Sequence, residues 1–227
     1  MTPRFLSSAR LRGLCWCLLL CLLCLCSVSL ALEINDARLQ SQAARYGVRG
    51  ERAAQAWLQL MRSGHDLPER DKLTRVNEFW NRSVLSSEDS RVWNQTDYWA
   101  TPLQTLGVGA GDCEDYVIGK YFSLVGMGVS PEKLQLIYVR ARMGGPGSRE
   151  SVAHMVLGYY ATPNAVPLVL DNLVSSILPA TQRRDLIPVF SFNTSGVYVD
   201  GKSSAPIERI GRWSDLMSRM ESEGIRP

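Results

Sequence analysis

The sequence predicts an α+β fold, and three observations lead to that prediction. Apolar residues recur at helical spacing in the first half of the chain. The second half contains short segments rich in β-branched and aromatic residues, separated by Gly, Pro or Asn. A chain of 227 residues is short enough to form one domain. Helices that precede a run of mostly antiparallel strands are typical of the α+β class.

Residues 1–31 have the pattern of a secretory signal peptide. Three arginines and no acidic residue precede an almost purely apolar stretch, Leu14–Cys26. Small residues follow at Ser29 and Ala31, the two positions that a signal peptidase reads, so we expect cleavage after Ala31. The apolar stretch is shorter than the roughly 20 residues of a membrane span. The alternative is an uncleaved N-terminal anchor, because the apolar run can extend to Leu32.

Removal of this leader changes the composition of the chain. The leader contains three of the 25 basic residues and none of the 22 acidic ones, so the remaining residues have no net charge. It also contains five of the six cysteines, which leaves Cys113 without a partner for an intrachain disulfide. Neutral charge and the lack of like-charge runs argue against a nucleic-acid or membrane surface. We therefore expect an exported protein, located in the periplasm, with a single domain over residues 32–227 and an N-terminal helical part.

Helices are expected where apolar residues recur every three to four positions. Pro102 and several glycines punctuate residues 93–111, which are expected to be irregular. The expected helices are Asn35–Arg62 with a break near Gly47 and Gly50, Arg70–Leu85, a helix that starts at Asp112 and ends at Gly126, and Arg212–Glu221.

Strands are expected after residue 131, where the period of the apolar residues changes. The candidate segments are Leu134–Met143, Val152–Tyr160, Val166–Leu170, Pro188–Phe192 and Gly196–Val199.

Cys113 is the candidate nucleophile. A glycine-rich loop, Gly109–Gly111, places it in the first turn of an expected helix. Unpaired amide groups and the positive end of the helix dipole favour a thiolate there. The alternative is a small buried cysteine that only fills space in the core.

A cysteine nucleophile needs a base and a group that orients the base. His65 lies in a polar turn, where we expect it to be exposed, whereas His154 lies in an alternating strand. Asp171 closes an apolar run, where a buried carboxylate would need a partner. Cys113, His154 and Asp171 thus occur in the order helix start, strand, strand end, although a core histidine and a turn aspartate explain the latter two equally well.

Three acidic residues surround the candidate nucleophile. Asp112, Glu114 and Asp115 should oppose a thiolate unless a cation neutralises them, and clustered hard oxygen ligands suit calcium. Asp112 and Asp115 can share a helical face, whereas Glu114 points elsewhere unless the loop bends it round. The alternative is that Asp112 and Asp115 merely cap the helix and complement its dipole.

The motifs Gly-Asp-Cys113-Glu-Asp-Tyr, Ala-His154-Met-Val-Leu and Leu-Asp171-Asn resemble those of the bacterial transglutaminase-like cysteine proteinases of the LapG type. The resemblance extends from Trp80 to about Asn193. It implies a papain-like, transglutaminase-like core in which Cys113 is the nucleophile, His154 the general base and acid, and Asp171 its orienting group. It also implies Ca²⁺ dependence through Asp112, Glu114 and, less directly, Asp115.

The resemblance implies a function as well: a calcium-dependent endopeptidase that cuts the N-terminal region of a large surface adhesin and so controls biofilm release. An inner-membrane cyclic-di-GMP receptor would inhibit it by binding. The oxyanion hole should use the backbone amide of Cys113, with Gln104 or Trp99 as a second donor. Two other functions remain open: an amide hydrolase or acyltransferase that acts on cell-wall peptides, and a non-catalytic binding module.

Overall fold

The structure, a computed structural model, describes residues 32–144 and 148–226. A seven-stranded sheet lies in the C-terminal half of this part of the chain. The predicted signal peptide lies outside these residues. Each strand pairs antiparallel with its neighbours, in the order β10-β9-β8-β4-β5-β6-β7. The strands are β4 (Leu134–Arg142), β5 (Ser151–Tyr159), β6 (Leu168–Leu170), β7 (Leu178–Pro179), β8 (Leu186–Asn193), β9 (Gly196–Val199) and β10 (Lys202–Ala205).

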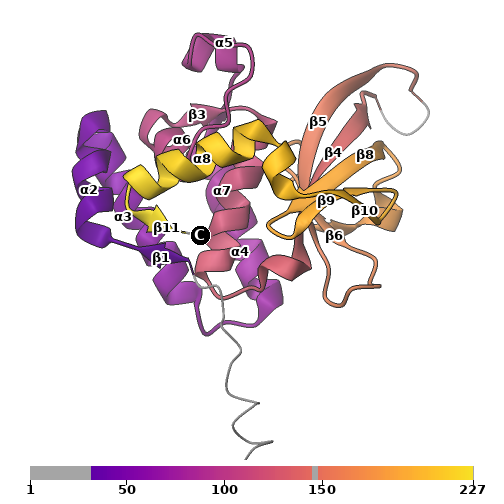
Figure 1. Cartoon of the computed structure of the whole chain (residues 1–227), viewed down its shortest axis with the longest axis horizontal. Coiled ribbons are helices and arrows are strands. Elements are labelled where there is room, and N and C mark those ends of the chain that lie inside the picture. Colours follow the sequence, from indigo (N-terminus) through magenta and orange to yellow (C-terminus); the bar gives the residue numbers. More distant parts are fainter. Residues whose placement is uncertain (1–31, 145–147, 227) are drawn as a thin grey trace, which may run out of the picture. The chain divides into compact units, whose positions relative to one another are not determined.

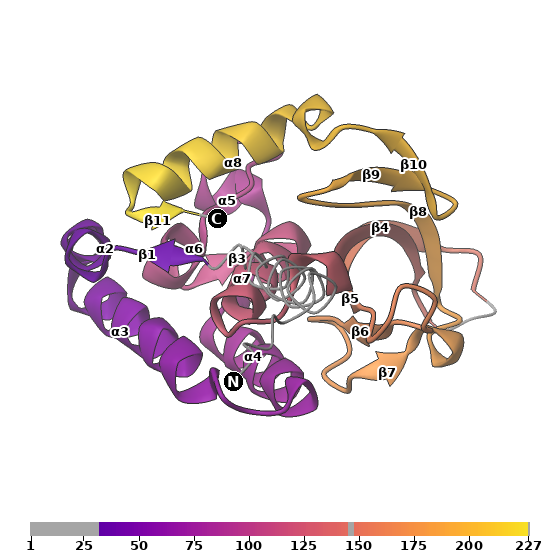
Figure 2. The same ribbon diagram turned by 60° about the horizontal axis from the view of Figure 1, so that its bottom comes forward.

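Helices from the first half of the chain gather on one side of this sheet, with α7 in the middle (Figures 1 and 2). The helix α7 is apolar around most of its circumference, because helices pack on one side of it and the sheet on the other. The helical elements are α2 (Asp36–Ala43), α3 (Gly47–Gly64), α4 (Glu69–Ser83), α5 (Asp89–Val92), α6 (Pro102–Val108), α7 (Cys113–Gly126), α8 (Gly211–Ser222) and the short 3₁₀ turns η1 (Ala44–Tyr46), η2 (Pro131–Lys133), η3 (Ala180–Gln182) and η4 (Ile207–Arg209).

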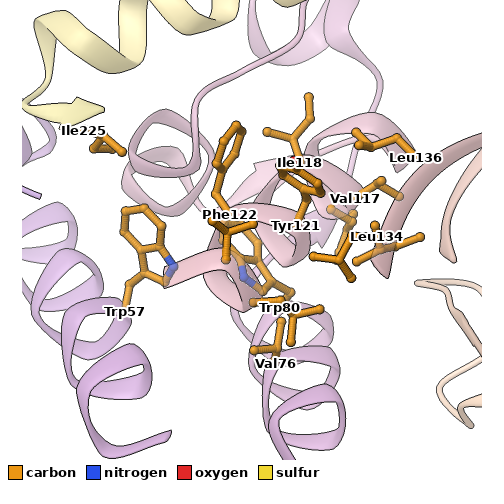
Figure 3. Packing of buried hydrophobic residues seen from close by; sticks show 14 of the residues in the cluster. Trp57, Val76, Trp80, Val117, Ile118, Tyr121, Phe122, Leu134, Leu136 and Ile225 are labelled. Atoms are coloured by element: carbon orange, nitrogen blue, oxygen red, sulfur yellow. The ribbon is translucent and has the colours of Figure 1, made fainter. Parts of the chain in front are cut away.

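Two buried tryptophans attach α3 and α4 to α7 (Figure 3). Trp57 and Trp80 both donate their indole N–H to the hydroxyl of Ser123, at 2.7 and 2.9 Å. That hydroxyl in turn donates to the carbonyl of Gly119, one turn earlier in α7. A buried indole needs such a partner, so these contacts fix the orientation of α7 as well as filling the core.

The C-terminal helix α8 closes the core from the other side. Its Trp213 stacks on Phe122 of α7, with 5.8 Å between the ring centroids. Beyond α8, β11 (Ile225–Arg226) pairs antiparallel with β1 (Glu33–Ile34), which ties the end of the chain to the start of the domain. None of the helices within residues 32–144 and 148–226 is long and apolar enough to cross a bilayer.

The predicted α+β class and the antiparallel sheet are confirmed, and the four predicted helices lie close to their observed positions. The predicted irregular segment is confirmed for residues 93–101 but is wrong for Pro102–Val108, which form α6. Pro102 occupies the first turn, where its missing N–H costs nothing, and Thr101 caps the helix by accepting from the Gln104 amide. The glycines that suggested irregularity lie at the C-terminal end of α6 and beyond it.

Candidate active site and metal centre

Two short parallel strands bring distant acidic segments together beside α7. The strand β2 (Leu85–Ser86) pairs with β3 (Ala110–Gly111) in the register Leu85 to Ala110 and Ser86 to Gly111. The residues that follow both strands therefore run side by side. One segment continues to Asp89, the first residue of α5, and the other to Asp112, which caps α7.

Cys113 is the first residue of α7, as predicted. Its Sγ lies 2.7 Å from Oε2 of Glu114, to which it donates a hydrogen bond. Burial, the charge and hydrogen bond of Glu114 and the charge of Asp112 raise the pKa of the thiol, whereas a hydrogen bond from the Met155 N–H lowers it. Burial and the acidic neighbours thus favour the neutral form, and Cys113 is a protonated thiol in this arrangement.

His154 lies on β5 beside Met155, the residue whose amide faces the Cys113 sulfur. The Nε2 atom of His154 is 2.8 Å from Oδ1 of Asp171, and both side chains are buried. Asp171 directly follows β6, which pairs with β5 so that Leu170 lies opposite Leu157. This pairing brings the carboxylate alongside the imidazole. The contact through Nε2 leaves Nδ1 as the ring nitrogen that can serve a thiol.

Asp171 is ionised and firmly held. Burial alone would raise its pKa, but the hydrogen bond and charge of His154, the Leu173 N–H and the hydrogen bond of Arg183 lower the pKa to about 2. Arg183 donates to Oδ2 of Asp171 at 2.8 Å and to Asp185 at 2.7 Å. The backbone carbonyl of Asp171 accepts from Asn81 of α4 at 2.9 Å.

Arg183 is a functional residue that has no local signal in the sequence. It follows Asp171 by 12 residues and lies beyond η3, so no local spacing links the two. A buried carboxylate does imply a cation nearby, but the sequence does not indicate which one.

A second set of carboxylates forms a cluster near the start of α7. One oxygen from each of Asp89, Asp112 and Asp115 lies within 4.8 Å of the others. Asp89 uses Oδ2 to accept from the Tyr98 amide at 2.5 Å, and Asp115 uses Oδ1 to accept from the Ala100 amide at 2.8 Å. The second oxygens, Oδ1 of Asp89 and Oδ2 of Asp115, are buried without a hydrogen-bond partner among the described residues.

This cluster has the properties of a cation site. Burial, followed by the charges of Glu114, Asp115 and Asp89, raises the pKa of Asp112 to about 9. Burial also raises the pKa of Asp115 to about 8, with the charges of Asp89 and Glu114 acting in the same direction. Buried carboxylates that repel each other and keep unpartnered oxygens are suited to a hard cation such as Ca²⁺.

A close approach of the backbone makes room for the cluster. A Cβ atom at Gly111 would lie 2.5 Å from Oδ2 of Asp115, one of the unpartnered oxygens. Glycine is therefore the residue that lets the β3 backbone run beside this carboxylate.

The structure brings together only two of the three acidic residues predicted to bind metal. Asp112 and Asp115 lie in the cluster, but the carboxylate of Glu114 contacts Cys113, and Asp89 completes the set instead. Asp89 has no distinctive signal in the sequence, because it lies in the polar run Ser86–Ser90, which follows the expected helix Arg70–Leu85. Its proximity to Asp112 depends on the parallel pairing of β2 with β3, which joins residues 25 positions apart.

The two candidates for a second oxyanion donor have different environments. The Gln104 side chain is already used: Nε2 donates to the Tyr98 hydroxyl at 2.9 Å and Oε1 accepts from the Thr101 amide at 2.8 Å. Trp99 is buried and stacks on Phe192, and its indole N–H has no partner in the described part of the chain. As predicted, the other histidine, His65, is exposed, and it contacts Asp66.

The chain is similar to proteins of known class. Residues 54–184 match the family model of the bacterial transglutaminase-like cysteine proteinases, BTLCP. No curated protein sequence matches. The solved structure of LapG from Legionella pneumophila is 36% identical, with a TM-score of 0.72, and the match covers 84% of this chain and 99% of that chain.

Two further LapG structures from Legionella pneumophila are similar to the same degree. The calcium-bound form is 36% identical with a TM-score of 0.70 over 82% of this chain and 99% of that chain. The EGTA-treated form is 35% identical with a TM-score of 0.72 over 84% of this chain and 100% of that chain.

The family match covers more than half of the chain, and the helices and sheet agree with the predicted transglutaminase-like core. The chain belongs to the bacterial transglutaminase-like cysteine proteinases.

Proposed function

We propose that this protein is a calcium-dependent cysteine endopeptidase with Cys113, His154 and Asp171 as its catalytic residues. The observation that carries the proposal is the buried contact of His154 with Asp171 at 2.8 Å. His154 lies on β5, and the amide of the next residue on that strand, Met155, faces the Cys113 sulfur. Membership of a cysteine proteinase family adds independent support.

The proposed reaction follows the usual course for a cysteine proteinase. His154 takes the proton of Cys113, and the thiolate attacks the carbonyl carbon of the scissile peptide bond. The amide of Cys113 at the start of α7 stabilises the oxyanion. His154 then gives its proton to the departing amine, leaving a thioester. Water, deprotonated by His154, attacks the thioester and releases the acid product and the free thiol. Asp171, held by Arg183, keeps the imidazole in the correct tautomer throughout.

Asp89, Asp112 and Asp115 would hold the calcium ion. Two of them keep buried, unpartnered oxygens, and the related LapG protein has a calcium-bound structure. Held there, calcium would supply positive charge, and such charge would favour the thiolate of Cys113, whose pKa is raised by burial and by its acidic neighbours. Glu114, which accepts the thiol hydrogen bond, must release Cys113 before the thiol can transfer its proton to His154.

The proposed substrate is the N-terminal region of a large surface adhesin, cut in the periplasm, with an inner-membrane cyclic-di-GMP receptor as the inhibitory partner. The substrate and the partner are those implied by the resemblance of the sequence motifs to the LapG-type proteinases, and the signal-peptide pattern of residues 1–31 supports export. Cleavage would release the adhesin and disperse a biofilm.

The test compares the wild-type protein with the Cys113→Ala variant, using a recombinant N-terminal adhesin segment with and without a calcium chelator. We expect cleavage only by the wild-type protein and only without the chelator, with one new N-terminus detected by mass spectrometry. In cells, Cys113→Ala should increase the adhesin retained on the surface. Processing of cell-wall peptides but not of the adhesin segment would contradict the proposal, as would slow labelling of Cys113 by a thiol-directed electrophile in calcium.

A further inference from the structure

The two backbone amides that orient the acidic cluster come from one short segment. Tyr98 donates its amide to Asp89 and Ala100 donates its amide to Asp115, at 2.5 and 2.8 Å. Each bond occupies one carboxylate oxygen, and the other oxygen stays buried without a hydrogen-bond partner among the described residues. The position of residues 98–100 therefore determines where the free oxygens of Asp89 and Asp115 point.

This segment has no regular secondary structure, so other elements must hold it in place. Arg219 of α8 makes several of the side-chain contacts that do so. One guanidinium nitrogen donates to the Tyr98 hydroxyl at 2.9 Å and to Oε1 of Gln104 at 2.8 Å, and the other donates to the Trp99 carbonyl at 2.7 Å. The guanidinium also lies over the Tyr98 ring, 4.4 Å from its centroid.

A second residue of the same C-terminal region, Glu223, holds Thr101, the residue that directly follows the segment. Oε1 of Glu223, the residue that caps α8, accepts from the hydroxyl of Thr101 at 2.9 Å. Figure 1 shows α8 running across α6 and α7, the two helices that follow this segment in the sequence. The segment is thus attached to α8 on one side and to the carboxylates of Asp89 and Asp115 on the other.

We infer that Arg219 is a positioning residue for the metal centre. It acts by fixing Tyr98, Trp99 and Gln104, which holds the amides of residues 98 and 100 in place for the carboxylates. The inference rests on the proposed function, because it requires the acidic cluster to bind calcium. No side-chain contact joins Arg219 to the carboxylates of the cluster within the described residues, so its effect passes through the segment.

The chemistry of the contacts explains why the residue is an arginine. A guanidinium is planar, offers five donors in a fixed geometry and stacks on an aromatic ring, so one side chain can hold three acceptors and a tyrosine face together. A lysine can reach the same region but cannot make these contacts at once. Outer residues that orient metal ligands typically change metal affinity by about 10- to 100-fold when they are replaced.

The test measures the calcium dissociation constant by calorimetry on the full chain for the wild type, Arg219→Ala and Arg219→Lys. Arg226→Ala is the matched control, since Arg226 is an exposed arginine close to α8 in the sequence that pairs only loosely with Glu221. We expect the dissociation constant to rise about 10- to 100-fold for Arg219→Ala and by an intermediate factor for Arg219→Lys. The control should stay within about twofold of the wild type, because it leaves the ligand-orienting contacts intact.

Thermal unfolding in chelator and in calcium separates positioning from a purely structural role. A structural role would lower the melting temperature equally in both conditions and leave the dissociation constant unchanged. The inference predicts a smaller calcium-induced rise in melting temperature for Arg219→Ala, with partial recovery in Arg219→Lys. Wild-type affinity in both Arg219 variants would overturn the inference alone. A wild-type protein that binds no calcium would overturn both the inference and the metal site of the proposed function.

Discussion

Asp115→Asn should stabilise the calcium-free protein and remove its response to calcium. Asp115 is fully buried, and its two oxygens differ: Oδ1 accepts from the Ala100 amide, whereas Oδ2 is buried without a hydrogen-bond partner among the described residues. Asparagine has nearly the same shape and can still accept from Ala100 through its carbonyl oxygen. The substitution therefore removes the charge while keeping the structural hydrogen bond.

The size of the effect follows from the pKa of Asp115, which is raised to about 8, mainly by burial. In the unfolded chain its pKa returns to an ordinary value near 3.8. Each pH unit above that pKa stabilises the ionised unfolded chain by about 1.36 kcal/mol, so at pH 7 ionisation stabilises the unfolded state by about 4 kcal/mol. Folded Asp115 gains almost nothing from ionisation below pH 8. The penalty is absent below pH 3.8, grows as the pH rises and is complete near pH 8. The Asp115→Asn variant avoids this penalty because the amide does not ionise.

The assay is urea unfolding at pH 5 and pH 7, in chelator and in calcium, with Asp66→Asn at an exposed position as the control. In chelator, Asp115→Asn should be more stable than the wild type by up to about 4 kcal/mol at pH 7 and by less at pH 5. Calcium at about 100 times its dissociation constant should stabilise the wild type by about 2.7 kcal/mol and the variant hardly at all. A variant less stable than the wild type in chelator at pH 7 would refute the assignment of Asp115 as an uncompensated buried acid.

Three further predictions concern residues of β3 and α7. Gly111→Ala should reduce the calcium-induced rise in melting temperature, because its Cβ would lie 2.5 Å from Oδ2 of Asp115, whereas Gly211→Ala, with no atom within 4 Å of its Cβ, should not. Gly119→Ala should lower the free energy of unfolding by about 1–3 kcal/mol despite the better helix propensity of alanine, because its Cβ would lie 2.3 Å from the Trp80 ring. Equal stability of the variant and the wild type in denaturant titrations would contradict this prediction. Lys120→Met should raise the free energy of unfolding more at pH 7 than at pH 9.5. Burial lowers the pKa of Lys120 to about 7, so the folded state increasingly disfavours its charge as the pH falls below 10.5. A gain that is independent of pH would show that the folded state tolerates the charge.

The helices and strands could be predicted where local pattern and burial agree. The strand β9 was predicted with its observed bounds, and β5 within one residue, because their apolar residues alternate or form short β-branched runs bounded by turns. The helix α6 was missed although its signals were present. Thr101 and Gln104 form a capping box around Pro102, but the glycines that follow are also typical of an irregular segment.

The candidate site divides in the same way. Cys113 at the start of a helix and Asp171 at the end of a strand are marked by their immediate neighbours in the sequence. Asp89 and Arg183 are not, because Asp89 reaches the cluster through the pairing of β2 with β3 and Arg183 reaches Asp171 through the turn after β7. Residues placed by contacts between distant segments leave no periodic signal in one sequence.

The two carboxylate sets in this protein have opposite electrostatic environments, and the difference indicates where a cation belongs. Asp171 is buried like Asp89 and Asp115 of the cluster, yet His154 and Arg183 lower its pKa to about 2. Asp115 has no such cation among the described residues, and its pKa is raised to about 8. The described part of the chain thus supplies positive charge to the carboxylate that orients the candidate base and none to the carboxylates beside the candidate nucleophile. A metal ion held by the cluster would supply the positive charge that is missing there, and this charge would favour ionisation of Cys113.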